Sequence, residues 1–320
     1  MTVTQNVEVT GRRRSSRGSL NSEQHITGEG AREKQAVALS SLVAAVGLTA
    51  FKIIVGVTTG SLGILAEAAH SGLDLVAAAM TFFAVRLSAR PPDPTHLYGH
   101  HKIENLSALL ETLLLLVTCA WIAREAAHRL LVHHPEIDVT VWSFAVMAVS
   151  IVVDVSRSRA LARAARQYRS QALEADALHF KTDIWSSTVV ILGLIAVKAG
   201  EAFPALRVLA SADAFAALGV SALVIWVSVR MGRRTVNELL DSAPAGMEPS
   251  IRAAVETVPG VRDCHDVRVR RSGSVLFIDL HVLVDGGQTL AEAHQLTETI
   301  EAAIHNMAPE ADVTVHPEPF

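Results

Sequence analysis

The chain has 320 residues, of which half are hydrophobic and 19% are charged. A soluble protein normally carries about a quarter charged residues, so this composition argues against a wholly soluble protein. The two cysteines, Cys119 and Cys264, are far apart in the sequence, which argues against a disulfide framework or a Cys-x-x-Cys metal site.

Residues 1–34 are polar and contain the basic run 12–14, which predicts a disordered tail. The run resembles a twin-arginine export signal, but such a signal needs an apolar stretch of about 7–15 residues and a cleavage site soon afterwards. Here the apolar stretch begins near Ala36 and is much longer. We therefore interpret this segment as a solvated cytoplasmic tail.

Apolar segments of roughly 20 residues follow the tail, and each is long enough to cross the hydrocarbon core of a bilayer. The six predicted spans are Gln35–Val57, Leu62–Val85, Glu104–Ala126, Val139–Val155, Leu173–Val197 and Asp213–Met231. They predict an α-helical membrane protein whose six-helix transmembrane bundle occupies residues 35–235.

Lys and Arg are concentrated in alternate connections between these spans. Many follow the second, fourth and sixth spans, whereas the opposite side carries only Arg124, Arg129, Lys198 and Arg207. The positive-inside rule therefore predicts a multi-pass protein of the cell membrane with both termini in the cytoplasm. The arginines at 157–169 could also bind anionic lipid headgroups, although setting the topology is sufficient to explain them.

After Pro244 the composition changes to that of a small soluble domain, predicted over residues 243–320. Its predicted elements are a helix at 248–258, strands at 267–270 and 275–284, a helix at 290–306 and a strand at 313–315. This αββαβ order predicts an open α+β sandwich of ferredoxin-like type. A domain of about 75 residues is long enough to fold if it dimerises or binds metal.

The most informative pattern is Ala-[Glu/Asp]-Ala-x-His-x-x-x-Asp, which occurs twice within the predicted spans, at 66–74 and 175–183. The i,i+4 spacing places each histidine above its aspartate on one helix face. Two such helices side by side would offer two imidazoles and two carboxylates, a ligand set for tetrahedral zinc. A single intramembrane histidine is more often a polar contact between helices, but packing does not require two matching copies. The predicted ligands are His70, Asp74, His179 and Asp183.

Two acidic residues, Glu67 and Asp176, precede these histidines by three positions and lie near the same helix face. They could orient the imidazole rings from outside the ligand set. They could equally be polar contacts between helices, and the sequence leaves both interpretations open.

Two further groups of candidate ligands lie outside the spans. In the connection at 91–102, three residues could close on one ion because Gly99 lets the backbone bend, and an exposed solvated loop is the alternative. These residues are Asp93, His96 and His100. In the terminal domain the candidates lie on separate predicted elements, so their spacing alone is weak evidence. They are His265, His281, His294, His316 and Glu318.

Over residues 35–320 the chain resembles the cation diffusion facilitator family. The resemblance rests on the six spans, the paired His-x-x-x-Asp helices, the αββαβ domain and a connection of the form Pro-x-Asp-x-x-His-x-x-Gly-His-x-Lys. The resemblance implies a transport site at the four intramembrane residues, a second site in the connection and a binuclear site in a cytoplasmic domain. It also implies a homodimer joined through these domains, in which Lys102 and Asp241 match a pair that forms an interlocking salt bridge. Two departures are a glutamate at position 318, where similar proteins often carry aspartate, and His70, where some members have aspartate.

Two nitrogens and two oxygens suit Zn²⁺, whereas oxygen-rich sites suit Mn²⁺ or Mg²⁺. Co²⁺ and Cd²⁺ fit the same geometry, and Fe²⁺ and Ni²⁺ stay open. Protons and metal would compete for the same ligand atoms, which predicts Zn²⁺/H⁺ antiport out of the cytoplasm, with further zinc in the cytoplasmic domain. A metalloenzyme would need an open coordination position, and a membrane-anchored metal sensor would not need six spans. We predict a transporter without enzymatic activity and without a nucleic-acid partner.

Overall fold

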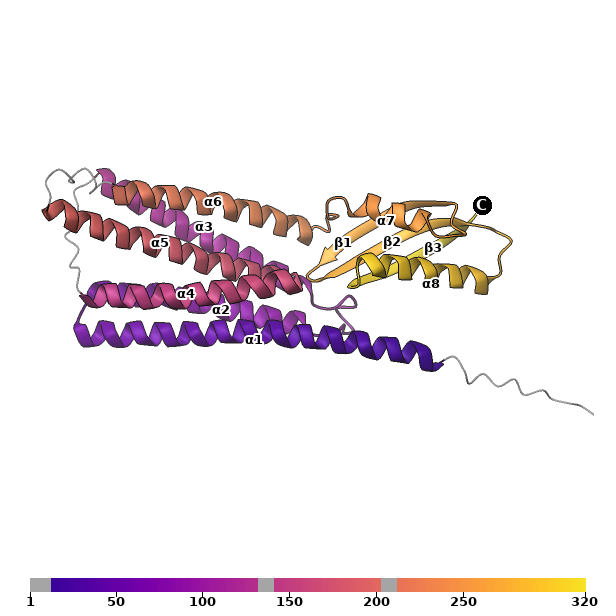
Figure 1. The fold of residues 1–320 in the computed structure, drawn as a ribbon, viewed down its shortest axis with the longest axis horizontal. Helices are drawn as coiled ribbons and strands as arrows, with labels where there is room; N and C mark the ends of the chain where they lie inside the picture. Colours follow the sequence, from indigo (N-terminus) through magenta and orange to yellow (C-terminus); the bar gives the residue numbers. More distant parts are fainter. Residues whose placement is uncertain (1–12, 132–140, 203–211) are drawn as a thin grey trace, which may run out of the picture.

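The computed structural model describes residues 13–131, 141–202 and 212–320, in which two regions of different architecture follow one another (Figure 1). Within these ranges the first region is made of six long helices. They are α1 (Arg13–Thr59), α2 (Leu62–Ser88), α3 (Lys102–Leu131), α4 (Val141–Tyr168), α5 (Gln171–Ala202) and α6 (Ala212–Leu239). The second region is a smaller α+β domain at one end of the helices (Figure 1).

The helices begin and end where the sequence supplies caps and breaks. Ser61 caps α2, because its side chain accepts a hydrogen bond from the backbone N–H of Ile64. Pro91 and Pro92 follow α2 and prevent its continuation. Among the described helices, three segments are long and apolar enough to cross a membrane: Gly30–Thr59, Glu67–Ser88 and Lys102–Arg124. The first region is therefore a helical membrane domain.

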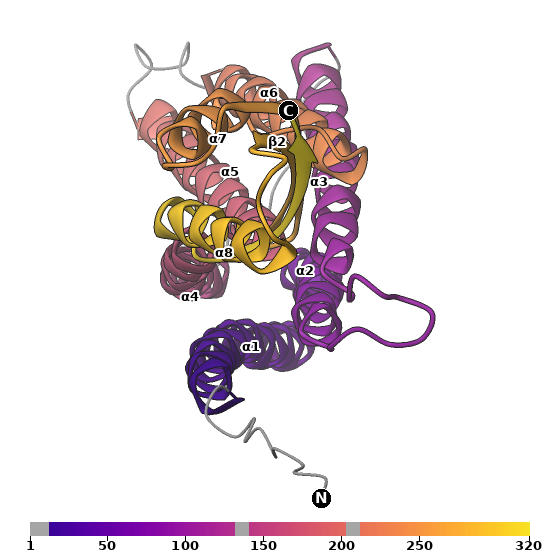
Figure 2. The same ribbon diagram turned by 90° about the vertical axis from the view of Figure 1, so that its right-hand side faces the viewer.

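The two helices that carry the repeated motif meet inside this bundle. α5 contacts α2, α3, α4 and α6, so it has a central position. α1 packs along α2 and α4, and α3 packs along α6 (Figures 1 and 2). The contact between α2 and α5 is what brings the two copies of the motif together.

All six helices extend beyond their predicted spans, and α1 and α4 extend the furthest. α1 begins at Arg13, inside the segment predicted to be a disordered tail, and no proline interrupts residues 13–59. α4 continues to Tyr168 instead of ending at Val155, because its extension is rich in alanine and arginine, which are good helix formers. The arginines at 157–166 therefore lie on a helix and not in a loop. Residues 1–12 and the predicted start of the fourth span at Val139 lie outside the described residues.

The carboxy-terminal domain confirms the predicted αββαβ order. Its elements are α7 (Met247–Glu256), β1 (Asp263–Ser272), β2 (Val275–Val284), α8 (Leu290–Met307) and β3 (Ala311–Pro319). The sheet order is β1-β2-β3, with an antiparallel first pair and a parallel second pair. β1 begins at Asp263, earlier than predicted. The sequence did not reveal this start, because an irregularity between His265 and Arg268 breaks the alternation of side chains along the strand. β3 is also longer than predicted, and its prolines are tolerated because it is an edge strand.

The two faces of this sheet have different roles. Helices α7 and α8 cover one face, where Ile251 and Val255 of α7 and Ile300 and Ile304 of α8 are buried in one core with alternate residues of β2. Successive side chains of a strand point to opposite faces. Because Leu280 of β2 belongs to this core, its neighbour His281 lies on the other face.

The hairpin between β1 and β2 joins the domain to the membrane helices. The backbone N–H of Gly273 donates to Asn105 Oδ1 of α3 at 3.1 Å. Lys102 Nζ lies 2.9 Å from Asp241 Oδ1, so the two residues that match the interlocking pair form an ion pair within one chain. Arg270 of β1 lies 3.6 Å from the second carboxylate oxygen of Asp241. These contacts connect α3, the end of α6 and the hairpin.

We expect Gly273→Ala to weaken this junction. Gly273 has a φ of +57°, and an added Cβ would lie 2.9 Å from the carbonyl oxygen of His101. The left-handed conformation alone costs about 1–2 kcal/mol for a residue with a side chain. The midpoint of thermal unfolding of the detergent-solubilised protein should therefore fall by several degrees. Gly47→Ala is the matched control, because Gly47 lies in a helix with open space around its Cα. A midpoint for Gly273→Ala that is no lower than that of Gly47→Ala would contradict this assignment.

Candidate functional site

The four predicted intramembrane ligands come together where α2 and α5 meet. His179 Nε2 is 3.1 Å from Asp74 Oδ1 and 3.6 Å from Asp183 Oδ2. His70 Nε2 is 3.9 Å from Asp183 Oδ1. Each histidine therefore faces the aspartate of the other helix, and His179 also faces the aspartate one turn along its own helix.

These distances, from 3.1 to 3.9 Å, lie near the edge lengths of a zinc tetrahedron. Ligand atoms that lie about 2.0–2.2 Å from zinc in tetrahedral geometry are about 3.3–3.6 Å from one another. One ligand atom from each of Asp74, His179 and Asp183 lies within 4.8 Å of the others. Asp183 Oδ2 is buried without a hydrogen-bond partner among the described residues, as expected for an atom that serves as a ligand. His70 lies outside this group of three, and its contact with the site is the 3.9 Å approach to Asp183.

The acidic residues that precede the two histidines both contact α1. Glu67 Oε2 lies 3.2 Å from Lys52 Nζ, which also donates to Ser71 Oγ at 2.7 Å. Asp176 accepts a hydrogen bond from Ser41 at 3.4 Å. The geometry therefore favours polar contacts between helices over the alternative in which these residues orient the imidazoles.

A buried charged pair that the sequence did not predict lies beside the site. Asp154 and Arg157, both on α4, are buried, and Arg157 Nη1 lies 3.4 Å from Asp154 Oδ1. Arg157 also donates to Ser41 Oγ of α1 and stacks over the ring of Phe180 at 3.5 Å from its centroid. The missed signal was an acidic residue inside a predicted span.

The connection between α2 and α3 gathers its three predicted ligands. Asp93 lies 3.2 Å from both His96 Nδ1 and His100 Nε2, through different carboxylate oxygens. The two imidazole rings have centroids 4.5 Å apart. Gly99 has a φ of +79°, and this left-handed conformation turns the backbone between the two histidines. The loop can therefore present two nitrogens and a carboxylate to one ion.

Asp93 is held in place by its own loop. It accepts hydrogen bonds from the hydroxyl and backbone N–H of Thr95 and from the backbone N–H of His96. These bonds, with the Thr95 hydroxyl first, hold the pKa of Asp93 well below its usual range because they favour the charged form. A carboxylate that stays ionised at acidic pH is available as a metal ligand.

A third cluster lies on the uncovered face of the carboxy-terminal sheet. His265, His281 and His316 are direct neighbours across β1, β2 and β3 in the strand register. Glu318 lies two residues beyond His316, on the same face of β3. Its carboxylate is 2.9 Å from His281 Nδ1, 3.3 Å from His265 Nε2 and 3.8 Å from His316 Nε2. The parallel pairing of β2 and β3 thus brings together residues that the sequence separates.

The fifth predicted ligand of this domain, His294, lies on α8 and not in the cluster on the sheet. His294 is exposed on α8, where its Nε2 lies 3.7 Å from Glu298 Oε1. Asp263, which was not predicted, lies 3.2 Å from His265 Nδ1. The hydrogen bond from His281 lowers the pKa of Glu318, because it stabilises the charged carboxylate. The intervening Pro317 does not displace Glu318 from the cluster.

Comparisons with known families identify the family of the chain. A family model described as the cation efflux transmembrane domain matches residues 38–240, and one described as the cytoplasmic domain of cation efflux proteins matches residues 244–320. The chain belongs to the cation diffusion facilitator family. The predicted resemblance is confirmed. As a facilitator, the chain is a multi-pass membrane protein that exports divalent metal cations.

Individual relatives of this facilitator match over nearly its whole length. The cation-efflux pump FieF of Yersinia pestis (strain Pestoides F) is 33% identical over 294 residues, which cover 90% of this chain and 94% of the pump. The pump of the same name from Pectobacterium atrosepticum is 30% identical over 287 residues, which cover 88% and 91%. Among solved structures, a MamM carboxy-terminal domain is 30% identical and covers 22% of this chain and 92% of that chain, with a TM-score of 0.22.

We expect Glu318→Ala to weaken metal binding by the carboxy-terminal cluster of this facilitator by about tenfold or more, since the carboxylate contacts all three histidines. Calorimetric titration of zinc into the purified full-length protein measures the effect, in a background where Asp183→Asn weakens the membrane site. Asp312→Asn is the matched control, because it removes an exposed carboxylate from the same strand. Equal losses in the two variants would argue against a ligand role for Glu318.

Proposed function

We propose that the chain exports Zn²⁺ from the cytoplasm in exchange for protons, and that the transported ion binds between α2 and α5. The observation that carries this proposal is the convergence of two His-x-x-x-Asp motifs inside the helical bundle. The proposed ligands of the transported ion are His70, Asp74, His179 and Asp183.

The charge of this ligand set supports a divalent ion. Two carboxylates neutralise Zn²⁺, so the loaded site carries no net charge into the low dielectric of the membrane. Two nitrogens and two oxygens in a tetrahedral arrangement suit zinc better than Mn²⁺ or Mg²⁺, which prefer oxygen ligands and higher coordination. Fe²⁺, Mn²⁺, Cd²⁺ or Co²⁺ efflux by the same mechanism is the alternative, and the pumps named above are described only as cation-efflux pumps.

Proton exchange follows from the chemistry of the same atoms. Imidazoles and carboxylates bind either a metal ion or protons, so metal binding releases protons and proton binding releases metal. A bundle that opens its central site alternately to each side of the membrane would then couple outward movement of metal to inward movement of protons. The transported ion and the protons thus compete for one site.

The remaining clusters support cytoplasmic roles. With both termini in the cytoplasm, the loop cluster at 93–100 and the carboxy-terminal domain face the compartment from which metal is taken. The match to a cytoplasmic domain model over residues 244–320 supports this orientation. We propose that zinc bound at the carboxy-terminal cluster stabilises a homodimer of this chain in the bacterial inner membrane or an equivalent cell membrane. The ion pair of Lys102 and Asp241 would fix that domain to α3.

Proton flux in liposomes tests the proposal. The full-length protein is reconstituted in vesicles with a pH-sensitive dye inside, and Zn²⁺, Fe²⁺, Mn²⁺, Cd²⁺ or Co²⁺ is added outside. Zn²⁺-driven proton movement supports the antiporter, whereas flux with other ions but not with Zn²⁺ keeps the transporter and overturns the ion assignment. Metal uptake without proton movement overturns the antiport. The absence of flux with every ion would favour a membrane-anchored metal sensor.

A further inference from the structure

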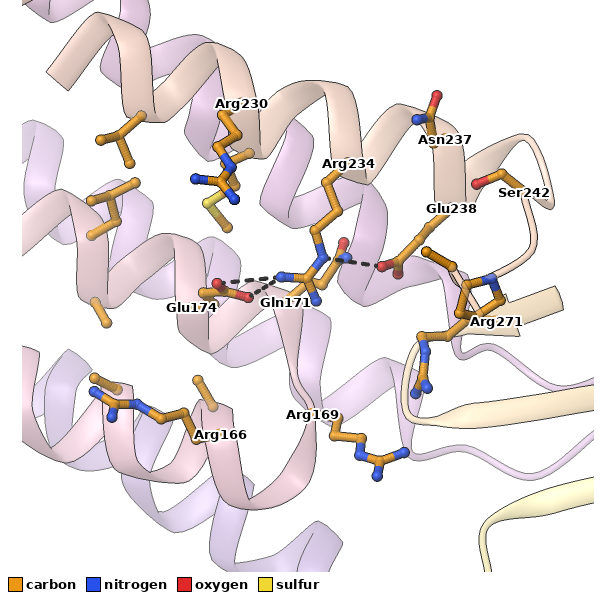
Figure 3. Close-up of a pocket in the computed structure, with 18 of the residues that line it drawn as sticks. Arg166, Arg169, Gln171, Glu174, Arg230, Arg234, Asn237, Glu238, Ser242 and Arg271 are labelled. Atoms are coloured by element: carbon orange, nitrogen blue, oxygen red, sulfur yellow. Dashed lines mark hydrogen bonds and ion pairs between the residues drawn. The ribbon is translucent and has the colours of Figure 1, made fainter. Parts of the chain in front are cut away.

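A large cationic cavity lies at the junction of the membrane domain and the carboxy-terminal domain. Its volume is about 1030 Å³, and its walls come from α4, α5, α6, the segment after α6 and the end of β1. Figure 3 shows arginine side chains from several of these elements around the same space. The candidate metal ligands described above do not line it.

The charge of the lining is strongly positive. Six cationic side chains line the cavity, namely Arg166, Arg169, Lys181, Arg230, Arg234 and Arg271, against the two acidic side chains Glu174 and Glu238. Arg234 engages both acidic residues, at 3.2 Å from Glu174 and 3.3 Å from Glu238, as the dashed lines in Figure 3 show. Arg169 is also paired, with Glu310 outside the lining, so four of the six cationic side chains have no ion pair among the described residues.

Two buried hydrogen-bond donors of the lining have no partner among the described residues. Gln171 is only 3% exposed, and its Nε2 makes no hydrogen bond, whereas its Oε1 accepts from Asn105. Nη1 of Arg271 is also buried without a partner. Burial and the nearby charge of Arg169 lower the pKa of Arg271, so its positive charge is costly where it stands. An anion with several acceptor oxygens would satisfy these donors.

Part of the cavity wall is apolar, although Lys181 of α5 also lines its deeper part. Leu178 of α5 and Val227 of α6 line its deeper part, toward the middle of the bundle. Gln171 and Asn237 line it nearer the cytoplasmic ends of the same helices. A wall with both apolar and cationic side chains fits a molecule that carries a hydrocarbon chain and an anionic group.

We propose that this cavity binds a phosphate-bearing anion, and that its source is an anionic phospholipid of the adjacent leaflet. The phosphate would accept hydrogen bonds from the unpartnered donors of Arg271 and Gln171, with Arg166 adding positive charge to the same cavity and an acyl chain along the apolar wall. Occupancy would tie α4, α5 and α6 to the carboxy-terminal domain through one ligand. This inference does not depend on which ion the protein transports.

Lipid binding by the full-length protein tests the proposal. The protein is equilibrated in detergent micelles with equal amounts of phosphatidylglycerol and phosphatidylcholine, and bound lipids are counted by native mass spectrometry. The wild type should retain phosphatidylglycerol preferentially. Arg166→Gln combined with Arg271→Gln should lower this preference by about 25-fold, from about fivefold for each arginine. Arg163→Gln is the matched control, because Arg163 is exposed on the same helix and does not line the cavity.

Two further arms separate the possible sources and guard against misfolding. Inorganic phosphate is added to the lipid-bound protein and, separately, to lipid-depleted protein in a thermal-shift assay. Lipid retention that resists phosphate supports the phospholipid, whereas a phosphate-dependent stabilisation without lipid preference overturns the lipid source and keeps the anion site. The single variant Arg166→Gln changes an exposed residue and should fold normally. No preference and no phosphate effect in the wild type, or an equal loss in Arg163→Gln, overturns the proposal.

Discussion

Asp183→Asn is expected to abolish metal-driven proton flux, lowering the initial rate by about 100-fold or more. Asp183 lies within 3.9 Å of His70 and within 3.6 Å of His179, so its carboxylate touches both imidazoles of the proposed site. The amide has nearly the same shape but no charge, so the loaded site would carry an unneutralised positive charge into the membrane. Changes to groups that merely support metal ligands already cost about 10–100-fold, and loss of a ligand should cost more.

The measurement is Zn²⁺-driven proton flux in proteoliposomes at matched protein content. Thr188→Ala is the control variant, because Thr188 is exposed on the same helix and its hydroxyl bonds back to the carbonyl of Ile184. Its flux should equal that of the wild type. Flux by Asp183→Asn within about threefold of the control would remove Asp183 from the transport site. Loss of flux in both variants would point instead to a general sensitivity of α5.

Arg157→Ala is expected to destabilise the membrane domain by about 3–5 kcal/mol, the usual cost of removing one partner from a buried ion pair. Arg157 is only 6% exposed and connects three helices, since it contacts Asp154 of α4, Ser41 of α1 and the ring of Phe180 of α5. Its removal leaves the buried carboxylate of Asp154 without a cation and opens a cavity above Phe180. For a domain of about 200 residues, the unfolding midpoint should fall by about 10 °C.

Thermal unfolding in detergent, followed by intrinsic fluorescence, measures this effect. Arg159→Ala is the matched control, because Arg159 is exposed on the same helix and its loss should shift the midpoint very little. Arg157→Met combined with Asp154→Asn removes both charges and should recover much of the lost stability. A midpoint for Arg157→Ala equal to that of Arg159→Ala would contradict the assignment of Arg157 as a structural cation.

The helices and the metal ligands differ in how far local sequence could predict them. The hydropathy of residues 35–235 predicted the helical bundle, because long apolar segments leave few alternatives in a membrane. The helix ends were harder to predict. α4 continues past Val155 through an arginine-rich segment that its charge alone suggested to be a loop. The loop cluster was predictable because Asp93, His96 and His100 lie within one turn-rich segment.

The other contacts depend on how strands and helices that are distant in the sequence pack together. The row formed by His265, His281 and His316 depends on the register of an antiparallel and a parallel strand pair, and periodicity within one strand carries no information about its neighbour. His294 lies apart from that row, on α8 beside Glu298, and its role as a ligand stays a prediction. The structural importance of Arg157 was also hidden, because its partners come from three helices.

The sequence by itself determined that this is a helical membrane protein with a repeated His-x-x-x-Asp motif and an αββαβ domain, since hydropathy, spacing and element order are local properties of the chain. Only the tertiary structure decided that Asp183 faces His70 at 3.9 Å, and that Glu67 and Asp176 contact α1. It also decided that arginines from α4, α6 and β1 surround one cavity. These are contacts between distant segments, and they depend on how helices and strands pack, which no local pattern encodes.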